Sequence, residues 1–230
     1  MKRRESFMQR LVIEGEKRIS GEIEVQGAKN SALPLLAGCV LARGEVVLHN
    51  CPGLSDVFAA CRILTCLGCK CRTQGNTVTV RSYELTGSSV PDELMREMRS
   101  SIVFLGAVLG RTGECSLSFP GGCELGPRPI DMHISALKQM GVSIKEEHGV
   151  LSCTCPRGIK GAKITLSFPS VGATENIMLA ACLAKGDTVI YNAAREPEFD
   201  LATFSMPAVQ GSADTLKHSL YNRSKKPARL

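Results

Sequence analysis

Three segments of the sequence share one order of local structure, and this internal repeat limits the choice of fold more than any other feature. Each segment has an apolar helix-like run, a turn that holds a glycine, and a short β-rich run. The segments are residues 31–52, 100–122 and 174–194. Their turn glycines, Gly44, Gly113 and Gly186, recur at intervals of about 70 residues. A repeat of this length predicts a domain built from three similar units.

The first two units continue in the same way. Residues 54–80 and 128–154 each predict a helix, a glycine just after its last turn, and two strands joined by a second glycine. Each complete unit is therefore predicted as α-β-α-β-β. We expect one α/β domain over residues 21–204, with its helices inside and its sheets outside.

The third unit stops matching after about residue 204. Pro207 stands where its second helix should continue, and a proline costs about 3 kcal/mol inside a helix. No apolar alternation follows it. We expect residues 205–230 to be an aberrant, disordered basic tail, as a frameshift or a gene fragment would produce.

The net charge of +6 does not predict a nucleic-acid partner. Five of the six charges come from Lys217, Arg223, Lys225, Lys226 and Arg229, after the last acidic residue, Asp214. The rest of the chain is nearly neutral. Aromatic residues make up only 4% of the sequence, so few side chains are available for nucleic-acid bases to stack on. No specific nucleic-acid binding is expected.

The eleven cysteines favour free thiols in the reducing cytoplasm over a disulfide framework, because their number is odd and the N-terminus lacks the apolar stretch of a signal peptide. The longest apolar run, residues 102–109, is too short to span a membrane. Cys66 and Cys69 form a C-x2-C pair, but no second pair follows at zinc-site spacing. We therefore expect no metal and no cofactor, with structural zinc or an iron–sulfur cluster as the minor alternative.

Four separated motifs resemble those of the UDP-N-acetylglucosamine enolpyruvyl transferases. They are GAKNSALP at 27–34, PGGCELGPRPIDMH at 120–133, PSVGATEN at 169–176 and NAAREPE at 192–198. The resemblance implies an inside-out barrel domain of three repeated α/β units, which agrees with the repeat described above. It also implies transfer of enolpyruvate from phosphoenolpyruvate to the 3-hydroxyl of UDP-N-acetylglucosamine, which is the first committed step of peptidoglycan synthesis.

The resemblance assigns roles to individual residues. Lys29 and Asn30 match the phosphoenolpyruvate-binding pair, and Arg99 matches an arginine that faces both ligands. Backbone N–H groups at a helix start, as predicted near Ser170, suit a diphosphate. The residues matched to UDP-N-acetylglucosamine binding are Arg99, Arg128, Pro129, Ile130, Asp131, Met132, His133, Phe168, Ser170, Val171 and Gly172.

Cys123 matches the residue that, in the family, donates a proton to C3 of phosphoenolpyruvate, forms a covalent adduct with it, and is alkylated by fosfomycin. A thiol beside lysine and arginine ionises more readily than a free cysteine. The flanking glycines predict a loop mobile enough to close over a ligand. The alternative is a structural loop cysteine.

The resemblance covers only the first half of the family's chain. In the family, residues 1–20 would pack on the second half, which also supplies a general base and two further arginines. We therefore expect this chain to be inactive alone, with a separate second-half chain as a potential partner. Two alternatives remain open: a non-catalytic UDP-sugar-binding remnant, and a relative of the shikimate-pathway enolpyruvyl transferase.

Overall fold

The computed structural model describes residues 20–23, 25–98, 100–118 and 130–196, together with Val12 and Gly15. Arg99, Cys123, Arg128 and Pro129 therefore lie outside the described residues, as do residues 205–230 and all of 1–20 except three positions. The division of the chain at residues 20 and 204 stays a prediction. No described helix is both long and apolar enough to cross a bilayer.

The first unit has the predicted order of elements. They are α1 (Lys29–Gly38), β1 (Glu45–Leu48), α2 (Ser55–Cys66), β2 (Lys70–Gln74) and β3 (Thr77–Arg81). Gly68 follows the end of α2 with a φ of +101°, a conformation that costs glycine little, so the predicted helix end is confirmed. The side chains of Val57, Cys61 and Leu64 are buried, whereas Leu54 and Phe58, from the same apolar pattern, are exposed at the edge of that face.

The second unit repeats this order. Its elements are the short 3₁₀ helix η1 (Ser101–Val103), α4 (Phe104–Thr112), β5 (Glu114–Ser118), α5 (Asp131–Gln139), β6 (Ser143–Glu147) and β7 (Val150–Thr154). Gly141 ends α5 with a φ of +89°. His148 and Gly149 join β6 to β7, and both have the positive φ that a tight hairpin turn of type I′ requires. The predicted strand pair is therefore confirmed.

The third unit is described through α6 (Val171–Ala181) and β9 (Val189–Tyr191), which are the predicted helix and strand. Three elements were not predicted: β4 (Ser89–Val90), α3 (Asp92–Glu97) and β8 (Lys163–Thr165). β4 comes just before the second unit in the chain, and β8 comes just before the third. β4 pairs in parallel with β5, and β8 pairs in parallel with β9, so each of these short strands extends the sheet of the unit that follows it. These elements are too short to show a helical or strand periodicity.

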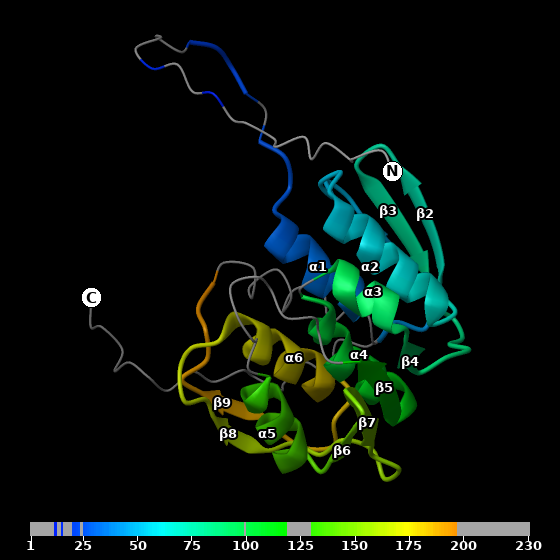
Figure 1. The fold of residues 1–230 in the computed structure, drawn as a ribbon, viewed down its shortest axis with the longest axis vertical. Helices are drawn as coiled ribbons and strands as arrows, with labels where there is room; N and C mark the ends of the chain where they lie inside the picture. Colours follow the sequence, from blue (N-terminus) through cyan, green and yellow to red (C-terminus); the bar gives the residue numbers. More distant parts are fainter. Residues whose placement is uncertain are drawn as a thin grey trace, which may run out of the picture.

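The strands form three sheets, with the orders β1-β3-β2, β4-β5-β7-β6 and β8-β9. β1 and β5 occupy corresponding places, because each is followed in space by the second strand and then the first strand of its unit's hairpin. The sheets lie around the outside of the helices (Figure 1). This arrangement confirms the prediction of helices inside and sheets outside for the described units.

The core is built around the first helix of each unit. α4 packs on α6 and α1, and α1 also contacts α6. The side chains of residues 104–109 in α4 and 173–180 in α6 are buried on every side. Burial of apolar surface stabilises a fold, so the contacts of α4 with α6 and α1 form the centre of the core.

Ten cysteines lie among the described residues, and all are free. No three His, Cys, Asp or Glu side chains in that part of the chain lie close enough together to hold a metal ion. Burial raises the pKa of Cys69 and of Cys153 to about 11. The side chains of Cys39 and Cys115 are at most 2% exposed, and burial raises their pKa further still.

These buried thiols predict a loss of stability at alkaline pH. A thiol in the unfolded chain loses its proton near pH 8.5, whereas Cys153 in the folded chain keeps its proton to about pH 11. The contribution of this thiol to the free energy of unfolding is therefore complete below pH 8.5. It is lost between pH 8.5 and 11, by up to about 1.4 kcal/mol per pH unit for one thiol. Urea unfolding under reducing conditions from pH 7.5 to 10 should show the fall, and Cys153→Ala should make it shallower. The exposed Cys66→Ala is the control, and equal slopes for both variants would contradict this account.

Candidate functional site

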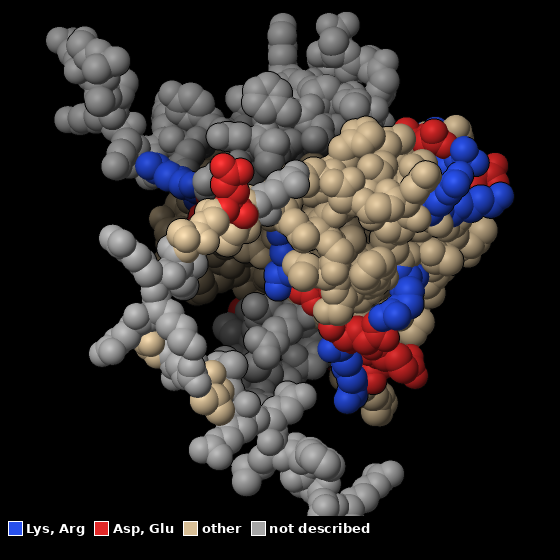
Figure 2. All heavy atoms as spheres, turned by 90° about the horizontal axis from the view of Figure 1, so that it is seen from above, with Lys and Arg blue, Asp and Glu red and all other residues tan. Residues whose placement is uncertain are grey.

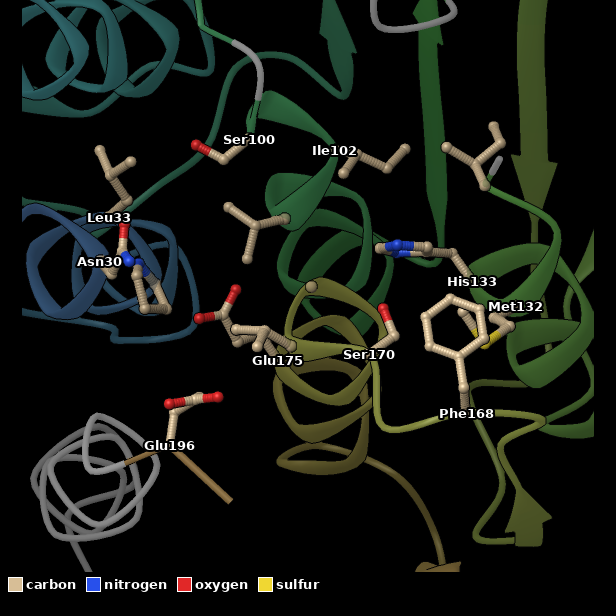
Figure 3. Close-up of a pocket in the computed structure, with 15 residues that line it drawn as sticks. Asn30, Leu33, Ser100, Ile102, Met132, His133, Phe168, Ser170, Glu175 and Glu196 are labelled. Atoms are coloured by element: carbon tan, nitrogen blue, oxygen red, sulfur yellow. The ribbon is translucent and has the colours of Figure 1, made fainter. Parts of the chain in front are cut away.

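A cavity of about 580 Å³ opens where α1, η1 and the N-terminal ends of α5 and α6 meet (Figure 3). Its described lining consists of Asn30, Leu33, Pro34, Ser100, Ile102, Val103, Ile130, Met132, His133, Phe168, Ser170, Val171, Gly172, Glu175 and Glu196. Every one of the four sequence motifs therefore supplies at least one residue. The cavity has the volume of a typical small-molecule site.

The N-terminus of α6 forms one wall. Ser170 is the N-cap residue, and its hydroxyl accepts a hydrogen bond from the Ala173 N–H at 3.4 Å. The Thr174 hydroxyl donates back to the Ser170 carbonyl at 2.7 Å, which ties the first turn to its cap. The first turn has no acidic residue, so the helix dipole and the first N–H groups favour an anion here. The predicted residues Ser170, Val171 and Gly172 all lie at this wall.

The residues before and at the start of α5 form the adjoining wall. Of the residues matched to UDP-N-acetylglucosamine binding, Ile130, Met132 and His133 line the cavity. Asp131, the first residue of the helix, is exposed and does not line it. Phe168 also lines the cavity, and it is 53% exposed (Figure 3). An aromatic ring this exposed at a cavity rim is available to pack on a ligand.

His133 is held by a buried amide. Its side chain is 7% exposed, and its Nδ1 lies 2.9 Å from the Asn176 Nδ2 on α6. Asn176 is itself fully buried and also donates to the Ile102 carbonyl at 2.9 Å. One amide group therefore joins α6 to η1 and α5, which are the elements that shape two sides of the cavity.

α1 places one of its two predicted residues at the cavity. Asn30 lies in the lining, whereas Lys29 does not. The Lys29 ammonium instead pairs with the Asp56 carboxylate on α2 at 2.9 Å, and its side chain is 45% exposed. An exposed ion pair of this kind contributes little to stability, so breaking it would cost little free energy.

Two acids in the lining were not predicted. Figure 3 shows the carboxylate of Glu175 directed toward Asn30, with Glu196 on the same side of the cavity. The side chain of Glu175 is only 9% exposed. A sequence signal for Glu175 existed, because Thr174, Glu175 and Asn176 are three consecutive polar residues inside an apolar helix. Glu196 belongs to the NAAREPE motif but had no assigned role. The remaining unpredicted lining residues are Leu33, Pro34, Ser100, Ile102 and Val103.

The described lining residues that carry charge are therefore both acids. The predicted cations Arg99 and Arg128, like Cys123, lie outside the described residues. Elsewhere on the described surface, basic and acidic side chains lie beside one another along the rim of the face in Figure 2, around an uncharged centre. That mixed pattern differs from the basic stripe typical of nucleic-acid-binding surfaces.

A family model described as EPSP synthase (3-phosphoshikimate 1-carboxyvinyltransferase) matches residues 13–219. The chain belongs to the EPSP synthase family. Solved structures of this fold align with the described domain. The enolpyruvyl transferase NikO from Streptomyces tendae has a TM-score of 0.70 at 20% identity, over 82% of this chain and 44% of that one. EPSP synthase from Acinetobacter baumannii has a TM-score of 0.61 at 18% identity, over 80% of this chain and 43% of that one. These likenesses confirm the predicted enolpyruvyl transferase fold.

Among relatives in the EPSP synthase family, UDP-N-acetylglucosamine 1-carboxyvinyltransferase 2 of Caldanaerobacter subterraneus subsp. tengcongensis is 51% identical over 86% of this chain and 47% of its own length. UDP-N-acetylglucosamine 1-carboxyvinyltransferase 1 of Symbiobacterium thermophilum is 48% identical over 85% of this chain and 46% of its own length. The chain thus spans about half the length of the curated relatives it matches.

Proposed function

We propose that this chain supplies the UDP-sugar side of an enolpyruvyl transferase site, in which enolpyruvate passes from phosphoenolpyruvate to the 3-hydroxyl of UDP-N-acetylglucosamine and phosphate is released. The observation that carries the proposal is the meeting of all four motifs at one cavity. Relatives with 45–51% identity that are named for this reaction support it. They favour the UDP-sugar reaction over the shikimate-pathway one.

The described residues suit an elongated, doubly charged nucleotide sugar. The α6 N-terminus at Ser170–Gly172 offers N–H groups to the diphosphate. On the opposite side, Glu175 and Glu196 offer hydrogen-bonding groups to the hydroxyls and the amide of the sugar. Asn30, which is matched to phosphoenolpyruvate, lies on this same side of the cavity, so its amide can contact the sugar as well. Outside the described residues, we assign Cys123 the transfer of a proton to C3 of phosphoenolpyruvate as an oxygen nucleophile adds at C2. We assign Arg99 and Arg128 the role of balancing the charges of the two ligands.

The proposal places the chain in peptidoglycan synthesis, with fosfomycin as an alkylating inhibitor of Cys123. The cytoplasm is the proposed compartment, and it is supported by the ten free thiols of the described residues.

Isothermal titration of the 230-residue chain with three ligands tests the proposed substrate. UDP-N-acetylglucosamine should bind, UDP should bind more weakly, and shikimate 3-phosphate should give no measurable heat. Ser170→Pro would disturb the helix cap and is therefore unsuitable as a test variant. Asn30→Leu is used instead, because it removes one polar group from the sugar side of the cavity and leaves the cap intact. Preferential binding of shikimate 3-phosphate would show that the proposed substrate is wrong.

Cys123 should be the thiol that reacts first with iodoacetamide near pH 7. Burial raises the pKa of Cys39, Cys69, Cys115, Cys153 and Cys182, so these thiols stay protonated and unreactive. Peptide mapping after brief labelling measures the order of reaction.

Two described thiols compete with Cys123. Cys66 is exposed, and a hydrogen bond from the Cys61 thiol lowers the pKa of the half-buried Cys71. A Cys66→Ser/Cys71→Ser double variant removes both competitors and should leave the main labelled peptide unchanged. If most of the label in the wild-type chain is found on Cys66 or Cys71, the assignment of Cys123 as the reactive thiol fails.

A further inference from the structure

Asn176 is a polar residue in the centre of the apolar core, and its amide can adopt only one orientation. The Gly106 N–H donates to Asn176 Oδ1, and the Ile102 carbonyl accepts from Asn176 Nδ2. A backbone N–H only donates and a carbonyl only accepts, so these two partners fix which end of the amide is oxygen and which is nitrogen. The nitrogen end is the one that faces His133.

This orientation determines where the His133 ring carries its proton. Asn176 Nδ2 has no lone pair to accept with, so His133 Nδ1, 2.9 Å away, must be the acceptor. A neutral imidazole that accepts at Nδ1 carries its hydrogen on Nε2. The ring is 7% exposed, so bulk water has little access through which to offer Nδ1 another partner.

The Nε2 side of the ring lies beside the first turn of α6. A Cβ atom built on Gly172 would lie 3.7 Å from Nε2 and 3.5 Å from Cε1, so the ring edge lies next to the backbone that is predicted to hold the diphosphate. His133 extends from α5 into the cavity near Ser170 and Ile102 (Figure 3).

We propose that Asn176 is a positioning residue that holds His133 in the Nε2–H tautomer, so that the ring donates to an anionic acceptor oxygen bound at the N-terminus of α6. The diphosphate oxygens of a nucleotide sugar are ionised at neutral pH and only accept hydrogen bonds, so a histidine fixed as a donor matches them. With Nδ1 occupied, His133 neither accepts a ligand hydroxyl there nor relays a proton through that atom. The identity of the ligand rests on the proposed function, whereas the tautomer follows from the geometry of this chain alone.

The tautomer can be measured directly on the wild-type chain. Long-range ¹H–¹⁵N spectra of the imidazole groups distinguish Nε2–H from Nδ1–H, and the chain has only four histidines. His133→Gln identifies the signals of His133. We expect the Nε2–H tautomer at pH 7 without ligand. A ring protonated on Nδ1 would overturn the proposal whatever the variants show.

Asn176→Asp replaces the N–H donor that faces His133 Nδ1 with a carboxylate oxygen, which is an acceptor, and it changes the shape of the side chain little. A carboxylate accepts the Gly106 N–H as before, but it requires a proton on His133 Nδ1 and leaves the Ile102 carbonyl without its donor. While the ring is neutral, its hydrogen then sits on Nδ1 and Nε2 has none to donate. At a pH where the ¹⁵N spectra show the neutral ring, we expect the affinity for UDP-N-acetylglucosamine to fall roughly 10- to 100-fold, as for a lost hydrogen bond to a charged group. Gln139→Glu, an exposed amide-to-acid change on the same helix as His133, should alter neither the His133 signals nor this affinity.

The two proposals fail in different ways. A wild-type chain with the Nε2–H tautomer that does not bind UDP-N-acetylglucosamine contradicts the proposed function. If the Asn176→Asp variant shows a neutral His133 ring with its hydrogen on Nδ1 and still binds this ligand as well as the wild-type chain, the positioning role is contradicted.

Discussion

Gly106→Ala should destabilise the domain by about 4 kcal/mol, a large share of the 5–15 kcal/mol that holds a typical domain together. A Cβ atom on Gly106 would lie far inside van der Waals contact of the Asn176 backbone oxygen and of its Oδ1. The backbone of α6 is packed on several sides and cannot move away cheaply. Overpacking of this kind costs about 1–3 kcal/mol or more. Displacing Asn176 also leaves the Gly106 N–H without its acceptor, which costs about 1–3 kcal/mol.

Gly110→Ala is the matched control, because Gly110 lies one turn later on the same helix. There the new Cβ would meet the end of the Leu41 side chain at 3.3 Å, and a flexible methyl group can shift. Alanine in place of glycine inside a helix gains up to about 1 kcal/mol. Urea unfolding should therefore separate the two variants clearly. Equal stabilities would show that α4 and α6 are not as close as described.

Phosphate release from phosphoenolpyruvate should stay at background when the 230-residue chain is tested alone with UDP-N-acetylglucosamine. The chain spans about half of its relatives' length, and the resemblance places the general base and two arginines in the other half. General base catalysis contributes about 10²–10⁴-fold, and loss of positioning can cost as much again. The rate should thus fall by at least four orders of magnitude relative to a full-length relative.

Adding the separately made remaining half of the Caldanaerobacter relative should restore phosphate release. Cys123→Ala in the same mixture should abolish it, whereas Cys66→Ala should not, because Cys66 is an exposed thiol away from the cavity lining. Robust release by the unassisted chain, lost in Cys123→Ala, would instead indicate that copies of this chain complete the site for one another. Binding without any release, even after addition, would favour the non-catalytic UDP-sugar-binding alternative.

The long elements of the fold were predictable from the sequence, and the short ones were not. α2 and α5 each show several apolar residues at helical spacing and end at a glycine, Gly68 or Gly141, with positive φ. β4 and β8 have two and three residues, which is too few for any alternation. They form because a neighbouring strand, β5 or β9, offers them backbone partners, and that neighbour is known only in three dimensions.

The lining of the cavity was predictable from the sequence where a motif marks backbone geometry, and less so where the lining depends on packing. Ser170–Gly172 and Ile130 lie at the cavity because a helix start and the residue before a helix are local features. Lys29 and Asp131 are next to lining residues in sequence, but a helix turns successive side chains in different directions. The partner of His133 is Asn176, 43 residues away, so no local pattern could identify it.

The central claim is that the cavity between α1, α5 and α6 is the binding site for the nucleotide sugar. The most direct test follows the backbone ¹H–¹⁵N signals of the chain during titration with UDP-N-acetylglucosamine. The account predicts saturable shifts centred on Asn30, His133 and Gly172, with the signals of the β2–β3 hairpin unchanged. Shifts centred on that hairpin, with the cavity signals unmoved, would contradict it.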